Sequence, residues 1–169
     1  MFDAGLGQLF VVRNAGNVIG EDVIASIEYG VVHLKTPLLL IMGHQNCGAV
    51  TACVNYTREH HENLLDKDSL DMDDEDSKFL SHDSPMSGLM EKIMPAVITG
   101  YRELASSHGD EFGDDQLVEL AVEHNVLNMV EKLSSMSEPL RSAILSKAVK
   151  VVGLKYSLQE GQMEELVKT

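Results

Sequence analysis

Apolar and polar positions in the first part of the chain alternate between strand-like runs and helical spacing. Residues 9–12, a β-branched and aromatic run followed by the turn residues 13–17, predict a buried strand. Apolar residues then recur at helical spacing from about 22 to 34, and Pro37 prevents this helix from continuing. The continuously apolar run 38–42 is typical of a strand covered on both faces in a parallel sheet.

Helical spacing returns after a polar stretch, at residues 85 to about 106 and again at about 115–134. Ser137 is predicted to cap a further short helix, with Pro139 tolerated in its first turn. Residues 149–158 predict the last strand, and Gly161 its turn. The helix at 115–134 has one apolar face, formed by Val118, Val122, Val126, Met129, Val130 and Leu133.

Strands and helices in this order predict one α/β domain over residues 1–169, with a mostly parallel central sheet flanked by helices. A chain of 169 residues, 44% of them hydrophobic, is long enough for one such domain with a sizeable core. In sheets of this kind, ligands bind at the carboxyl ends of the strands. His44 and Cys47 directly follow the strand at 38–42, so they lie at such an end.

An acidic insertion at about residues 55–84 interrupts the alternation. Within it, residues 66–76 have no hydrophobic period and are dense in carboxylates, as is typical of a solvated segment. Calcium binding is an alternative because Asp-x-Asp spacing occurs here. The glycine and the terminal glutamate of a calcium loop are not at the required places, which favours the solvated insertion.

Charge and composition exclude several classes of partner. A formal net charge of −14 argues against nucleic acid and against an anionic membrane surface. The longest apolar run, at residues 37–43, is too short to span a bilayer, and the N-terminus lacks the pattern of a secretory signal. The 2 cysteines cannot form a disulfide scaffold. We therefore expect a cytoplasmic, reducing location.

His44 and Cys47 are the candidate metal ligands, because imidazole nitrogen and thiolate sulfur are preferred by zinc. The spacing His-x-x-Cys is a weak signal by itself, and an ordinary packed pair is the alternative. Cys53 lies on the following helix, where six residues rotate its sulfur by roughly 600° and raise it by about 9 Å from Cys47, so a buried structural role is expected. Structural or solvated roles are expected for His33, His108 and His124. A metal role is left open for the three histidines that border the insertion: His60, His61 and His82.

Three stretches of the chain resemble the β-class carbonic anhydrases. Residues 26–52, SIEYGVVHLKTPLLLIMGHQNCGAVTA, resemble the second zinc motif of that family with its preceding helix and strand. Residues 5–19, GLGQLFVVRNAGNVI, resemble the strand and turn before it. Residues 121–133 and 150–166 resemble the family's C-terminal helix and last strand, and all motifs occur in the family's order.

The resemblance implies a zinc site, of which this chain supplies a part. The family binds zinc through Cys, His and Cys, and His44 and Cys47 match two of these ligands, with Gly48 as the adjoining backbone. Residues 13–16, RNAG, match the family's turn near the metal pocket. The first motif, Cys-x-Asp-x-Arg, precedes the family segment that matches residues 2–7 and is absent here, which implies an N-terminally truncated member lacking the family's first strand. We therefore expect an exposed sheet edge and exposed apolar surface.

The function that the resemblance implies is zinc-dependent, reversible hydration of carbon dioxide to bicarbonate, impaired in this chain by the missing motif. Zinc would act by lowering the pKa of a bound water molecule. The resemblance also implies a homodimer or a higher homo-oligomer. Two alternatives stay open: a non-catalytic family member that serves as a binding or assembly subunit, and a hydrolase of carbonyl sulfide or carbon disulfide.

Overall fold

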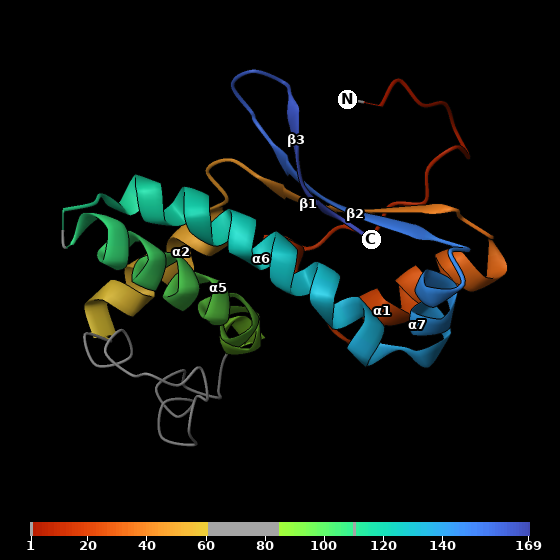
Figure 1. Ribbon diagram of the computed structural model, residues 1–169, viewed down its shortest axis with the longest axis horizontal. Helices are drawn as coiled ribbons and strands as arrows, with labels where there is room; N and C mark the ends of the chain where they lie inside the picture. Colours follow the sequence, from red (N-terminus) through yellow and green to blue (C-terminus); the bar gives the residue numbers. More distant parts are fainter. Residues whose placement is uncertain (1, 61–84, 110) are drawn as a thin grey trace.

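A three-stranded sheet lies at the centre of the computed structural model, which describes residues 2–60, 85–109 and 111–169. Strand β1 (Leu38–His44) pairs in parallel with β2 (Lys150–Tyr156), and β2 pairs antiparallel with β3 (Met163–Lys168). Helices flank this sheet, so the predicted α/β class is confirmed (Figure 1). Strand β3 was not predicted, because its sequence, MEELVK, has no apolar alternation and is mostly exposed.

The helices form two groups at opposite ends of the sheet, connected by α6, which runs diagonally across the molecule (Figure 1). Helices α2 and α5 pack with the first part of α6 beyond the carboxyl end of β1, whereas α1 and α7 lie at the other end. The helical bounds are η1 (Ala15–Asn17), α1 (Glu21–Glu28), η2 (Tyr29–His33, π-helical), α2 (Gly48–His60), α5 (Pro85–His108), α6 (Asp114–Met136) and α7 (Glu138–Leu145). None of these helices is long and apolar enough to cross a bilayer.

The predicted helices are confirmed, including the apolar face of α6, whose six predicted members are all buried. Ser137 caps α7 as expected: its hydroxyl oxygen accepts the backbone N–H of Leu140 at 3.2 Å. The same hydroxyl donates to Glu28 at 2.7 Å, so the cap also ties α7 to α1. The predicted insertion falls largely on residues 61–84, which lie outside the described residues.

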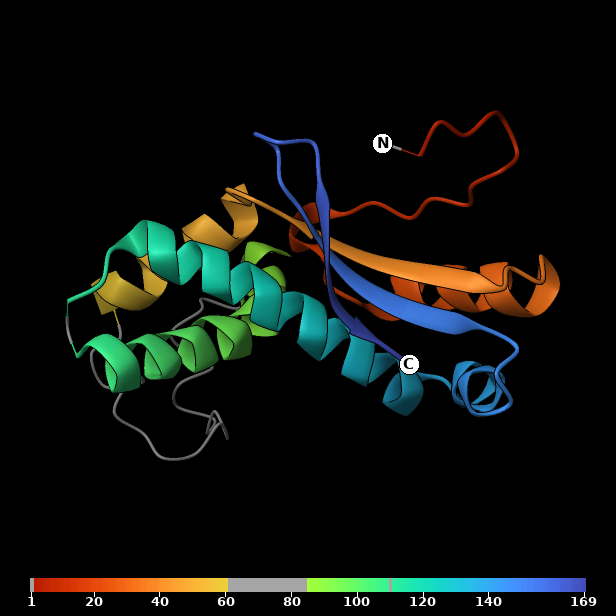
Figure 2. The same ribbon diagram turned by 45° about the horizontal axis from the view of Figure 1, so that its top comes forward.

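The strand predicted at residues 9–12 is wrong. These residues follow an irregular path outside the sheet (Figure 2), and Leu9, Phe10 and Val11 are 50%, 48% and 64% exposed. Their β-branched and aromatic side chains favour extended backbone, but a strand also needs a neighbour for its N–H and C=O groups. In the described part of the chain they pair with no strand, and Phe10 instead packs on the Tyr29 ring at 6.1 Å between centroids.

Strand β1 is covered less completely than its apolar sequence predicts. Ile41 and Gly43 are buried on one face, whereas Leu40 and Met42 are only half-buried and Leu38 is exposed. Within the described residues only β2 pairs with β1, so the other edge of β1 has no strand beside it. This edge of β1 is thus unpaired among the described strands, and the expected exposed apolar surface is found at residues 9–12.

Helix α6 packs closely on the sheet because two glycines leave room for it. A Cβ atom added to Gly43 would lie 2.8 Å from Val126 and 2.9 Å from Val122. A Cβ added to Gly153 would lie 2.9 Å from Val126 and 2.8 Å from Val167. All four distances are shorter than van der Waals contact allows, so glycine is required at these positions for α6 and β3 to lie where they do.

We expect Gly153→Ala to lower the free energy of unfolding by about 1–3 kcal/mol, because the added methyl group overpacks the contact with Val126. Urea denaturation measures the change. Gly20→Ala is the matched control, since a Cβ at Gly20 meets nothing within 4 Å. Equal stability of Gly153→Ala and wild type would show that α6 is not held at this distance.

Candidate functional site

A four-residue turn at 44–47 connects the carboxyl end of β1 to the start of α2, as the sequence predicted. The Gln45 N–H donates to the carbonyl of Tyr156 at 2.9 Å, which fixes the turn to β2. Asn46 has a φ of 55°, in the left-handed region that Asn tolerates better than most residues. The carbonyl of Cys47 accepts from the backbone N–H of Thr51, at 2.9 Å, and so begins the hydrogen bonding of α2.

His44 is exposed and its ring is oriented by its neighbour. The Nδ1 atom lies 2.9 Å from the carbonyl oxygen of Gln45. A carbonyl oxygen only accepts, so Nδ1 carries a proton, and in the neutral imidazole Nε2 keeps its lone pair. A histidine held in this way through one ring nitrogen presents the other to a metal, which is the arrangement common among metal-ligating histidines.

Cys47 supplies the second donor of the turn. Its side chain is 4% exposed and forms no disulfide. Imidazole nitrogen and thiol sulfur suit zinc in kind, but a zinc site takes at least three protein ligands. No group of three or more His, Cys, Asp or Glu side chains within the described ranges is placed to hold a metal ion. The donor atoms of His44 and Cys47 are therefore of the kind that zinc prefers, but two ligands are fewer than a zinc site needs.

Cys53 has the structural role that its position on α2 predicted. Its side chain is fully buried, and its sulfur contacts the carbonyl oxygen of Met90 at 3.8 Å. Burial raises the pKa of the Cys53 thiol to about 12, and a hydrogen bond with Thr57 opposes this effect only in part. A neutral, enclosed thiol is a poor nucleophile and a poor metal ligand.

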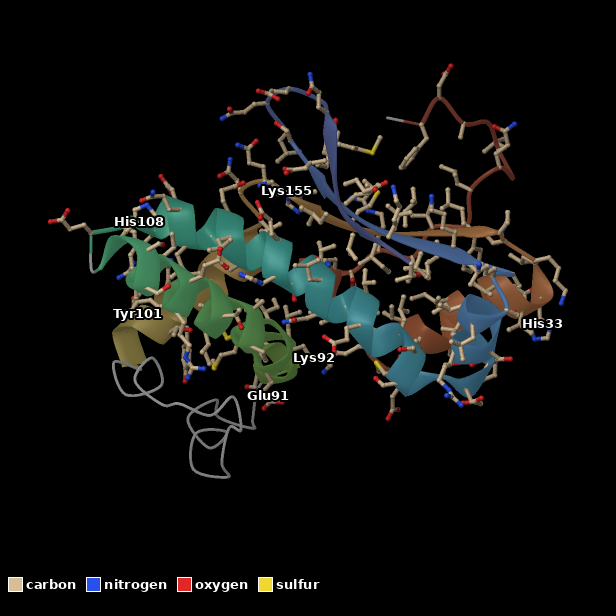
Figure 3. All side chains as sticks on the ribbon, in the orientation of Figure 1. His33, Glu91, Lys92, Tyr101, His108 and Lys155 are labelled. Carbon is tan, nitrogen blue, oxygen red and sulfur yellow. The ribbon has the colours of Figure 1, made fainter. Side chains whose placement is uncertain are left out.

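The other described histidines lie in structural or surface contacts. His33 ends η2 with its ring centroid 5.3 Å from that of Tyr29, far from the candidate turn (Figure 3). His124 lies 2.9 Å from a carboxylate oxygen of Glu103, and His108 contacts the hydroxyl of Ser107 at 2.8 Å. The structure does not describe His61, His82 or the side chain of His60. A metal role for these histidines at the insertion therefore stays a prediction.

The turn at residues 13–17 lies beside the start of α2, next to the candidate ligands. Gly16 has a φ of 65°, and a Cβ there would approach Ala49 of α2 to 3.3 Å and Ile93 of α5 to 2.7 Å. Its carbonyl accepts the side-chain amide of the fully buried Asn125 at 2.7 Å. Gly16 is thus packed between α2, α5 and α6, whereas Arg13, Asn14 and Ala15 before it are exposed.

A lysine surrounded by three glutamates adjoins the candidate turn and was not predicted from the sequence. Lys155 Nζ lies 2.5 Å from Glu123, 3.4 Å from Glu119 and 4.0 Å from Glu164, between α6 and the β2–β3 hairpin (Figure 3). Burial opposes the charge on Lys155, but the hydrogen bond and charge of Glu123, with those of Glu119, outweigh it and raise the pKa of the lysine. The sequence features that could have predicted this cluster are Lys155 inside a mostly apolar strand, and Glu119 and Glu123 four residues apart on one helix.

Comparisons with known proteins agree on one family. The family model described as carbonic anhydrase matches residues 1–163. The carbonic anhydrase of Mycolicibacterium smegmatis is 32% identical over 164 residues, covering 97% of this chain and 66% of the relative. Carbonic anhydrase 2 of Mycobacterium tuberculosis is 30% identical over 167 residues, covering 96% of this chain and 64% of the relative. The chain therefore spans slightly less than two thirds of the length of these relatives.

Solved structures with the same fold are β-carbonic anhydrases. The Coccomyxa enzyme in complex with acetazolamide aligns with a TM-score of 0.70 at 22% identity, over 99% of this chain and 65% of that one. A tetrameric enzyme from Sordaria macrospora aligns with a TM-score of 0.68 at 21% identity, over 98% and 72% of the two chains. At such identities these matches show the fold alone.

We expect the Cys53 thiol to resist modification in the native protein. In a Cys47→Ser variant, where Cys53 is the one thiol left, reaction with a disulfide reagent at pH 8 should be at least about a hundredfold slower than in the urea-unfolded chain, because both burial and the raised pKa suppress the thiolate. Thiol release followed by absorbance measures this rate. Rapid reaction under native conditions would show that α2 opens at Cys53.

Proposed function

Because the chain belongs to the β-carbonic anhydrase family, we propose that its protein catalyses the reversible hydration of carbon dioxide to bicarbonate. The observation that supports this most directly is the turn at 44–47, which places His44 and Cys47, three residues apart, at the carboxyl end of a parallel strand. Ligands of α/β sheets bind at that edge. The relatives named above are carbonic anhydrases, and their alignments cover nearly the whole length of this chain.

We propose zinc as the metal and His44 and Cys47 as two of its ligands. When bound in such a site, zinc acidifies a water molecule so that a hydroxide nucleophile is available near neutral pH. The part of this chain in the reaction is to present the Nε2 atom of His44, which the hydrogen bond from Nδ1 to Gln45 leaves free. The remaining ligands come from outside the described residues or from a second polypeptide.

A non-catalytic family member is the second candidate function. The described ranges contain no group of three ligating side chains, and two ligands give a weak zinc site. Such a protein would keep the fold and serve as a binding or assembly subunit. The two candidates differ in zinc content and in activity, so one set of measurements separates them.

For the enzyme, we expect bound zinc and carbon dioxide hydration above the buffer rate, both lost in His44→Ala and Cys47→Ser. Loss of one ligand should weaken zinc binding by at least about a hundredfold. Mass spectrometry of the metal and stopped-flow hydration with a pH indicator measure the two properties. His33→Ala and Cys53→Ala are matched controls, since neither residue lies at the turn.

Two results would overturn these proposals, the first that of the enzyme and the second that of the two ligands. The first is less than about a tenth of a zinc ion per chain together with no hydration above buffer, which the non-catalytic candidate predicts. The second is zinc binding that survives both His44→Ala and Cys47→Ser, which would place the metal elsewhere.

We propose further that the chain forms a homodimer or a higher homo-oligomer through its exposed apolar surface. Phe10 and Val11 are about half exposed or more, and Phe10 is continuous with the exposed ring of Tyr29. Apolar surface of this kind marks association sites in soluble proteins.

We expect Phe10→Ser with Val11→Ser to weaken self-association at least about tenfold, because apolar anchors at the centre of an interface carry most of its binding energy. Sedimentation velocity over a range of concentrations measures the change. Leu145→Ser is the control, because Leu145 is an exposed apolar residue of a different element, at the end of α7. A wild-type chain that is monomeric at micromolar concentration would contradict the proposal.

A further inference from the structure

We propose that Glu119, held by Lys155, positions the turn that carries His44 and Cys47. Glu119 does so by accepting the backbone N–H of Asn46, the residue just before Cys47. The inference rests on the proposed function, because it assigns a positioning residue to the turn that the proposal makes a metal site.

The contact that carries the inference joins α6 to the centre of the turn. The Asn46 N–H donates to Oε1 of Glu119 at 3.1 Å, across 73 residues of sequence. Asn46 is also the residue of the turn with a left-handed φ, of 55°. A left-handed residue other than glycine is energetically unfavourable, so the hydrogen bond offsets part of the cost of keeping the turn in this shape.

Lys155 aims the carboxylate of Glu119 at the turn. The two oxygens have different partners: Oε1 accepts from Asn46, whereas Oε2 lies 3.4 Å from Lys155 Nζ. Lys155 is itself fixed, since its side chain is 16% exposed and Glu123 holds its ammonium group at 2.5 Å. Lys155 also faces Gly43 across the β1–β2 ladder, one residue before His44. The two contacts of Glu119 therefore connect Lys155 on β2, through α6, to Asn46 in the turn.

The two central residues of the turn are held by different elements. Gln45 donates to the carbonyl of Tyr156 on β2, and Asn46 donates to Glu119 on α6. Removal of the Glu119 carboxylate releases the half of the turn next to Cys47 and leaves the half next to His44 attached to the sheet. This asymmetry separates a positioning role from general stabilisation.

The test compares Glu119→Ala, Glu119→Gln and Glu123→Gln in the full 169-residue chain. Native-state amide hydrogen exchange by NMR is the first readout. In Glu119→Ala we expect protection of the Asn46 amide to fall about tenfold, while the Gln45 amide and the core of α6 keep theirs. Glu119→Gln keeps an acceptor oxygen and should restore most of the protection. Glu123→Gln leaves the Asn46 partner in place and keeps an oxygen that accepts from Lys155, so we expect a smaller fall in Asn46 protection than in Glu119→Ala.

Lys155→Met is a second route to the same state, for use if Glu119→Ala does not fold. With Lys155 removed, Glu119 loses the partner that aims it, and we expect a smaller fall in Asn46 protection, about threefold. The inference is overturned if Asn46 protection equals that of wild type in Glu119→Ala or, where that variant does not fold, in Lys155→Met. It is also overturned if protection falls equally at Asn46 and throughout α6.

Zinc affinity, from competition with a chromophoric chelator, is the second readout. We expect Glu119→Ala to weaken binding by about tenfold, as loss of a group that orients a metal ligand does. Failure of the wild type to bind zinc would count against the proposed function, whereas the hydrogen-exchange result would still decide the positioning role. Zinc binding by wild type that is equal in Glu119→Ala would overturn the positioning role and leave the proposed function intact.

Discussion

The close approach of α6 to the sheet is the constraint on which the rest of the structure depends. Gly43 on β1 and Gly153 on β2 leave a space that the methyl groups of Val122 and Val126 fill, at distances that no Cβ atom could share. The contact sets both the height of α6 above the strands and its rotation about its own axis. Glu119 lies one helical turn before Val122, so the same contact brings its carboxylate to the carboxyl end of β1. A packing contact in the core thus determines where a charged group meets the candidate site.

The sequence predicted those elements of the fold that depend on the spacing of apolar residues within one segment. The helix at 114–136 and the cap at Ser137 were predicted because an apolar stripe and a capping hydroxyl are properties of one segment. The failure at residues 9–12 has the opposite cause: their β-branched composition describes a backbone preference, whereas a strand requires a neighbour that sequence periodicity does not supply. Strand β3 was missed for the complementary reason, because β2 provides its hydrogen bonds while its own side chains are mostly exposed.

The place of the candidate turn in the fold was predictable from the sequence, whereas the side chains that hold the turn were not. His44 and Cys47 stand out because their residue types suggest a metal, and the strand before them places them at a sheet edge. Neither the residue type nor the sequence position of Glu119 and Lys155 indicates a role at the candidate site. On an acidic chain of net charge −14, one glutamate among many looks like solvated surface. Only the approach of α6 to β2, which depends on contacts between residues far apart in sequence, shows that this glutamate reaches the turn.

The exposed apolar segment and the candidate site are joined through one short turn. Residues 9–12 lead directly into Gly16, whose carbonyl is held by Asn125 of α6 and whose α-carbon lies against Ala49 of α2. Ala49 follows Cys47 by two residues, so the segment that lacks a neighbour is connected to the helix that begins at the candidate ligand. A partner that covered residues 9–12 would order the chain leading into this turn. The path of residues 9–12 and the start of α2 are therefore linked by covalent connection and by the packing of Gly16.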